Sequence, residues 1–218
     1  MKNLMKLFIF ILVVTLVSDS FAQTFGVKAG LNLSNQISKS NNYTFSDDYK
    51  MNPGFHIGAT AEFTISHFIS IETAMLITTK GYKMSIGDST FEFKVNSNLF
   101  YLDIPLTAKV TFGVGAVEIC GVFGPYLGIG LSGKDKIEQT IQGETETFNE
   151  TIKWGSDQEH DYRRLDFGLT MGVVVEINSI QIGLSYGLGL ANISSYTFNG
   201  HDEYNRVIGL SVGYKFRK

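Results

Sequence analysis

The sequence predicts an all-β fold: an eight-stranded, antiparallel, up-and-down transmembrane β-barrel. Three observations predict it. Apolar residues recur at every second position in eight segments, most segments are about ten residues long or slightly longer, and the connections between them alternate between long and short. A ten-residue strand that rises about 3.3 Å per residue and tilts by roughly 40° spans about 25 Å, the height of the apolar band of a membrane barrel.

The first four segments show this alternation clearly. Residues 25–34 carry apolar side chains at every odd position and polar side chains or glycine at every even one. Residues 54–65 repeat this division, and residues 101–112 repeat it with the apolar side chains at even positions. Residues 69–80 follow the same rule with one clear exception, Leu76. Each segment is therefore predicted to be a strand with one apolar face.

The second half of the chain predicts four more strands, at 117–131, 164–177, 180–190 and 207–216. Pro125 makes the first of them the least regular, because proline cannot donate to a strand ladder. The stretch 168–190 could instead cross a bilayer as one helix, but it would then place Glu176 in hydrocarbon and carry many helix-weakening glycines. Two strands joined at 178–179 turn Glu176 into the barrel interior, so the sequence favours two crossings.

The connections between these strands alternate in length. The long ones are 35–53, 85–98, 132–162 and 192–205, and the short ones are 66–68, 113–116 and 178–179. Short turns are then all periplasmic and long loops all extracellular. In loop 132–162, β-favouring alternation at 137–141 and 145–152 predicts a hairpin that extends the fifth and sixth strands. This hairpin could bind a partner strand or a surface ligand, and a mobile surface loop without a partner is the alternative. Across the predicted loops, the apolar residues to test first for such binding are Phe91, Phe93 and Trp154.

The N-terminus has the layout of a cleaved secretory signal peptide over residues 1–22, which leaves 23–218 as one barrel domain. Lys2 and Lys6 precede an apolar run at 7–17, and a small-residue cleavage site follows. The mature chain has one cysteine, so no intramolecular disulfide is expected. The net charge of -3, without a basic block, indicates no nucleic-acid partner.

The less apolar face of the strands is rich in glycine, serine and threonine and carries charges of both signs. This composition suits a narrow lumen in which the charges form a salt-bridge network. The residues predicted for this network are Lys28, Glu62, Glu72, Lys80, Asp103, Lys109, Glu118, Arg164, Asp166, Glu176 and Lys215. A secreted lipocalin-like barrel with its apolar face inward is the alternative, but its solvated exterior would need more charge.

Aromatic side chains gather where the apolar face meets the short turns. They are Phe25, Phe63, Phe112, Tyr214 and Phe216. This is the position of the aromatic girdle at a membrane interface.

The small size of the predicted barrel and the spacing of its histidines bear on catalysis and conduction. His160 with Asp157 and Asp161, and His201 with Asp202, could form a small catalytic site at the rim. Such pairs are common in solvated loops, so the chain is predicted not to be an enzyme. Eight strands enclose an interior that side chains fill, so an open solute pore is not expected, and a narrow channel is the alternative. The dispersed histidines and single cysteine show no metal-ligand spacing, and no cofactor is predicted.

Several stretches resemble the PorT-like, "porin family" outer-membrane β-barrel proteins of diderm, Gram-negative-type bacteria. They are FGVKAGLNLSN, IETAMLITTKGYKM, YLDIPLTAKV, VFGPYLGIGLSGK and IGLSVGYKF. The resemblance covers residues 25–216 and implies an eight-stranded outer-membrane barrel of about the size of OmpA or OmpX, with no shared catalytic residues. Some members of this family are linked to a protein-secretion apparatus.

The sequence therefore predicts an exported, monomeric barrel of structural or interaction type in the bacterial outer membrane. Its expected partners are the membrane lipids and an envelope or secretion-system protein bound through the extracellular loops. A secretion-apparatus assembly factor is the more specific alternative.

Overall fold

The fold is an antiparallel barrel in a computed structural model that describes residues 23–40, 43–44, 49–88, 91–114, 117–157, 159–196 and 200–216. The barrel strands are β1 (Gln23–Ser40), β4 (Asn52–Thr64), β5 (Ile69–Lys80), β7 (Phe91–Val114), β8 (Val117–Ile141), β10 (Leu165–Ile177), β11 (Ile180–Gly189) and β12 (Asp202–Phe216). Four shorter strands, β2 (Tyr43–Thr44), β3 (Tyr49–Lys50), β6 (Lys83–Gly87) and β9 (Glu144–Thr151), lie at the loop end. The predicted signal peptide, residues 1–22, lies outside the described residues.

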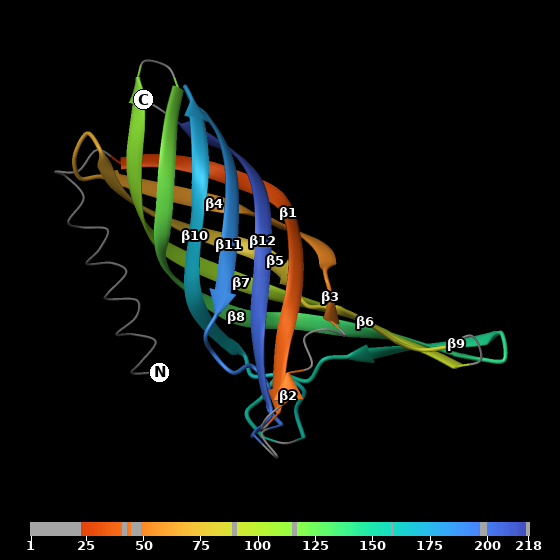
Figure 1. Cartoon of the computed structure of the whole chain (residues 1–218). Helices are drawn as coiled ribbons and strands as arrows, with labels where there is room; N and C mark the ends of the chain where they lie inside the picture. The colour runs from red at the N-terminus through yellow and green to blue at the C-terminus, as the bar shows by residue number, and fades with distance from the viewer. Residues whose placement is uncertain are drawn as a thin grey trace.

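Eight strands close into a ring. Neighbours in the ring follow the order β7, β5, β4, β1, β12, β11, β10, β8, and β8 pairs again with β7. The first and last strands meet with Phe25 opposite Phe216, and every pairing is antiparallel (Figure 1). The predicted eight-stranded up-and-down barrel is confirmed. Within the described ranges, no helix is long and apolar enough to cross a membrane.

The outer wall of the barrel is apolar. Leu31, Met75 and Leu184 are 68%, 59% and 58% exposed, and similar side chains follow at alternate positions around the ring. In water this continuous apolar surface would be unfavourable, whereas in a bilayer it contacts lipid. The wall excludes the lipocalin-like alternative, in which the apolar face points inward.

The turn at 178–179 separates the two strands predicted within 168–190. Ile177 pairs with Ile180, and Asn178 has a φ of 54°, a left-handed conformation that asparagine adopts more readily than most residues. Glu176 is 2% exposed and faces the interior. The interpretation as two crossings is therefore confirmed.

The loop end differs from the prediction, because strands continue where loops are expected. The prediction of a loop at 85–98 is wrong, because strand β6 continues to Gly87 and strand β7 begins at Phe91. Loop 132–162 does form the expected hairpin, with β8 paired to β9, but its second strand does not extend the sixth barrel strand. Strand β8 pairs with β7 on one side and β9 on the other, and β10 begins only at Leu165. Continuous backbone hydrogen bonding of β8 with both β7 and β9 stabilises these polar extensions outside the membrane.

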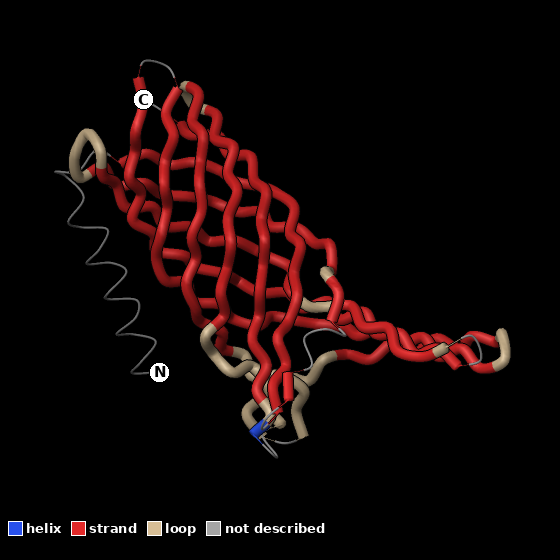
Figure 2. The backbone as a smooth tube through the Cα atoms, viewed as in Figure 1, coloured by secondary structure: helices blue, strands red, loops and turns tan. Residues whose placement is uncertain are grey.

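We call the resulting projection the arm: β6, residues 91–99 of β7, residues 132–141 of β8, and β9. Figures 1 and 2 show it leaving the barrel at the loop end and extending to one side. The two-residue β3 pairs with β6 at its base.

Candidate functional site: a closed lumen under a loop cap

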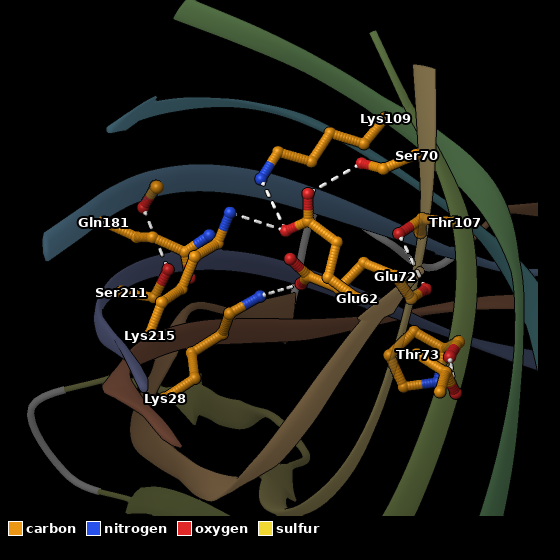
Figure 3. A network of polar contacts seen from close by, with 12 residues as sticks. Lys28, Glu62, Ser70, Glu72, Thr73, Thr107, Lys109, Gln181, Ser211 and Lys215 are labelled. Atoms are coloured by element: carbon orange, nitrogen blue, oxygen red, sulfur yellow. Dashed lines mark hydrogen bonds and ion pairs between the residues drawn. The ribbon is translucent and has the colours of Figure 1, made fainter. Parts of the chain in front are cut away.

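Charged side chains meet inside the barrel near the turn end. Lys109 and Lys215 lie 3.0 Å and 2.6 Å from Glu62, and Lys215 lies 2.7 Å from Glu176. Lys109 also forms an ion pair with Glu176. Figure 3 shows Lys109 and Lys215 converging on Glu62 from different strands. Gln181 donates to Glu176 at 2.7 Å, so both charge and hydrogen-bonding capacity are matched. We call Glu62, Lys109, Glu176 and Lys215 the turn-end cluster.

A second charged group lies toward the loop end. Lys80 is 3.0 Å from Asp103 and 2.9 Å from Asp166, and its side chain is 2% exposed. Its Nζ also lies over the rings of Tyr101 and Tyr126, at 4.6 Å and 4.5 Å from their centroids. Tyr126 donates to Asp166 as well, at 3.2 Å. We call Lys80, Asp103, Asp166 and the two tyrosines the loop-end cluster.

Little open space remains between the two clusters. Lys28 and Glu72 form an ion pair at 2.5 Å, and His56 Nδ1 is 2.7 Å from Asn32 Oδ1. The cavity that these residues line has a volume of about 130 Å³ and also touches Lys80 of the loop-end cluster. A larger hollow of about 430 Å³ lies at the turn end, below the turn-end cluster. The lumen is therefore interrupted by paired charges at two levels.

Two residues predicted for the lumen network do not join it. Arg164 precedes β10, is exposed, and donates to the carbonyl of Gly130 at 3.1 Å, because the strand begins one residue later than predicted. Glu118 lines the turn-end hollow but forms no ion pair with the described residues.

The predicted girdle residues Phe25, Phe112 and Phe216 are more than half exposed on the outer wall. Tyr214 is 49% exposed there and Phe63 half-buried, so these five side chains lie near the turns.

A hydrophobic cap covers the lumen at the loop end. It consists of Leu99, Tyr101, Ile152, Tyr162 and Ile193, with Trp154 packed against them. The Trp154 and Tyr101 rings meet edge to face at 5.4 Å. Trp154 occupies the space beside Gly130, where a Cβ atom would collide with its ring. Burial raises the pKa of the Tyr162 phenol well above its ordinary value. Sequence periodicity misses this cap because its contacts join strand β7 to two irregular segments, 152–162 and 190–196.

Residues 21–195 match the outer membrane protein beta-barrel domain family. The chain belongs to this family. Membership agrees with the apolar outer wall and places this outer membrane barrel in the bacterial outer membrane.

Solved structures with similarity to this outer membrane barrel share little sequence with it. Ail of Yersinia pestis is 16% identical, with 88% of this chain and 98% of that one covered and a TM-score of 0.39. Neisserial surface protein A is 17% identical, with 90% and 99% covered and a TM-score of 0.36. Outer membrane protein W of E. coli is 17% identical, with 90% and 100% covered and a TM-score of 0.34. A comparison with curated proteins found no match.

The rim histidines of this outer membrane barrel have partners other than those predicted. His201 Nε2 is 3.1 Å from Glu203, whereas Asp202 accepts from Asn192 at 2.6 Å. The His160 ring packs beside Gly155, and Asp161 accepts from the backbone N–H of Lys153 at 2.7 Å. Neither histidine therefore meets the aspartate expected to orient it. Among the described residues, no three His, Cys, Asp or Glu side chains form a group able to hold a metal ion.

Replacing Trp154 with alanine is expected to loosen the cap. Loss of this partly buried ring should reduce local stability by about 2 kcal/mol, and trypsin cleavage after Lys153 or Arg163 should become roughly 30-fold faster. Limited proteolysis of the folded protein in detergent measures this rate. Phe148→Ala, on the exposed arm, is the control and should leave the rate unchanged. Equal cleavage of Trp154→Ala and wild type would contradict the packing role.

The hydrogen bond in which the Glu203 carboxylate accepts from the protonated His201 ring raises the pKa of His201. A raised folded-state pKa means that the pair stabilises the protein fully below pH about 6.5 and that this stabilisation disappears as the pH rises through the folded-state pKa. Since the pair is partly exposed, we expect less than about 1 kcal/mol. Urea unfolding at pH 5.5 and 8.5 should show a stability difference between wild type and His201→Gln only at the lower pH. The same difference at both pH values would argue against a titrating pair.

Proposed function

We propose that this outer membrane barrel is a non-enzymatic interaction protein that holds the arm outside the cell as a binding surface for an envelope protein. The exposed apolar face of the arm carries this proposal. Ile86, Phe91, Ile141 and Phe148 are 49%, 43%, 50% and 47% exposed, although they lie beyond the lipid-facing wall. Apolar groups exposed to water in one patch are characteristic of protein interaction sites.

The register of the arm places these side chains on one face. Phe91 lies opposite Ile141, Ile86 opposite Phe93, and Val95 opposite Ile137. Phe148 extends the same face onto β9, opposite Ile137. Side chains at directly paired positions point to the same side of a sheet, so these residues share one face, with Val95 buried on it and the others at least partly exposed. We call it the apolar face.

The edge of the arm offers a second means of contact. Strand β9 pairs with β8 and ends the order of strands in the described sheet. Its outer edge can accept an extended segment through backbone hydrogen bonds, with the apolar face beside it for the partner's side chains.

The more specific proposal concerns the partner and the route to the membrane. The resemblance to PorT-like proteins supports a component of a secretion apparatus as the partner. The charged, apolar and small-residue pattern of residues 1–22 supports export through a cleaved signal peptide. The closed lumen supports a role that requires neither a pore nor a cofactor.

Photo-crosslinking in intact cells tests this proposal. A photoreactive residue at Phe148 should capture an envelope protein, because Phe148 is on the apolar face. Thr147 is its neighbour on β9 and points to the opposite face, so the same substitution there is the matched control. Equal capture at both positions, or none at Phe148, would reject the apolar face as the binding surface.

A further inference from the structure

The lysines of the arm and its base all lie on the face opposite to the apolar face. Lys50 of β3 pairs with Lys83 of β6, Lys83 pairs with Asn96, and Asn96 pairs with Lys136 of β8. Lys94 and Lys134 have the same strand parity as these residues. We call Lys50, Lys83, Lys94, Lys134 and Lys136 the lysine face.

The two faces of the arm have opposite charges. The lysine face includes Glu92 and Glu138, which leaves a formal charge of 5 − 2 = +3. The apolar face carries four acidic residues and no lysine or arginine among the described positions: Asp135, Glu144, Glu146 and Glu150. Segregation of this kind is not required for a solvated sheet, on which either sign can lie on either face.

The positive charges on the lysine face are only partly compensated. Lys94 forms an ion pair with Glu92 at 2.8 Å, and Lys136 with Glu138 at 2.6 Å. Lys50 and Lys83 lie directly opposite each other, and neither forms an ion pair within the described part of the chain. Like charges at directly paired positions destabilise a sheet. Together with Lys94 and Lys136 they line a hollow of about 260 Å³, large enough for an anionic group.

The lysine face continues the lipid-facing wall of the barrel. On β7, even-numbered residues point outward from Leu106 at the wall to Lys94 on the arm. On β8, a bulge opposite Phe100 and Tyr101 shifts the register, so Leu131 of the wall is followed by outward-pointing Lys134 and Lys136. Lys134 is three residues beyond Leu131, about 10 Å along the strand. The lysine face therefore begins just beyond the apolar wall, on the side of the wall where lipid headgroups lie.

The arm's direction affects which of its two faces points toward the membrane. Figures 1 and 2 show β7 and β8 continuing from the barrel wall into the arm, which extends to one side at the loop end. A sheet that leans outward turns its outer face toward the bilayer and its inner face away from it. The apolar face is thus left open to the outside, and the lysine face lies toward the headgroups.

We propose that the lysine face binds the phosphate groups of anionic lipids in the outer leaflet and thereby fixes the arm against the membrane surface. Lysine ammonium groups donate up to three hydrogen bonds and attract phosphate as point charges. Paired lysines that repel each other in the free protein are stabilised when a phosphate lies between them. The lysine face is a different surface from the apolar face, which we propose binds the protein partner.

Binding of a defined lipid to the detergent-solubilised, full-length mature protein tests the proposal. The probes are bis-phosphorylated lipid A and the same lipid without phosphates, with bound lipid counted by native mass spectrometry. Wild type should bind the phosphorylated lipid, and Lys50→Gln with Lys83→Gln should weaken that binding by about 30-fold. The dephosphorylated lipid should bind both proteins equally weakly.

Lys39→Gln with Lys153→Gln is the matched control, because it removes the same charge from exposed positions outside the lysine face. Its affinity should equal that of wild type, and heat-modifiable gel mobility should show that every variant is folded. Equal weakening by the two double variants, or no preference for phosphorylated lipid in wild type, would overturn the proposal. Displacement of the lipid by millimolar inorganic phosphate would also overturn it, since the site would then recognise free phosphate rather than a lipid surface.

Discussion

Replacing Lys80 with methionine is expected to lower the free energy of unfolding by about 3–5 kcal/mol. The substitution keeps an unbranched side chain of similar length but leaves Asp103 and Asp166 without their shared counter-ion. Asp166 is fully buried, so water cannot replace the lost charge. Reversible urea unfolding in detergent micelles or lipid vesicles, followed by tryptophan fluorescence and gel mobility, measures the change.

Lys94→Met is the matched control for this prediction. Lys94 also forms an ion pair, but its side chain is 49% exposed. Exposed pairs of this kind contribute at most about 1 kcal/mol. Similar losses for Lys80→Met and Lys94→Met would show that the loop-end cluster does not stabilise the barrel.

Replacing Glu176 with glutamine is expected to destabilise the protein by about 3 kcal/mol. Lys109 and Lys215 would then share Glu62 as their remaining partner in the turn-end cluster, and two buried ammonium groups would face one carboxylate. The same urea experiment measures the effect.

Glu118→Gln makes the same chemical change at the same end of the lumen. Glu118 lies opposite Glu176 in the register of β8 and β10, yet forms no ion pair with the described residues. We expect a change within about 0.5 kcal/mol, or a slight stabilisation from reduced repulsion between the two carboxylates. A loss of about 3 kcal/mol on Glu118→Gln would show that the turn-end cluster has been assigned the wrong residues.

Alternation within a strand determines much of this fold, and for that reason the sequence predicts the ring. A residue such as Lys109 must face inward when its neighbours Ala108 and Val110 face lipid, and the same rule places Glu62, Glu176 and Lys215 in one enclosure. Charges of both signs confined to a narrow lumen then have few partners except one another.

The same rule does not predict which charges pair, or what happens beyond the membrane. The pairing of Lys80 with both Asp103 and Asp166 depends on the stagger of three strands around the ring, which alternation alone does not specify. At Leu131 the bulge changes which residues of β8 point outward, from odd-numbered to even-numbered ones. Alternation within the barrel part of β8 therefore does not predict that Lys136 points outward. The arm is rich in threonine, glutamate and lysine, and such polar composition is equally typical of a loop.

The cap shows a different limit. Trp154, Tyr162 and Ile193 come from irregular segments, and their contact is decided by the space that Gly130 leaves beside the barrel mouth. A glycine in a strand indicates that something approaches closely but not what approaches. The sequence identified Trp154 as an apolar loop residue without showing that it turns inward.

Single-channel recording in planar lipid bilayers tests the central claim, a barrel whose lumen is blocked by two charged clusters beneath a cap. We expect purified, folded wild-type protein to give no stable conductance steps, because paired side chains interrupt the lumen at both levels. Reproducible, large conductance steps from protein shown to be folded by its gel mobility would contradict the closed lumen and favour a channel.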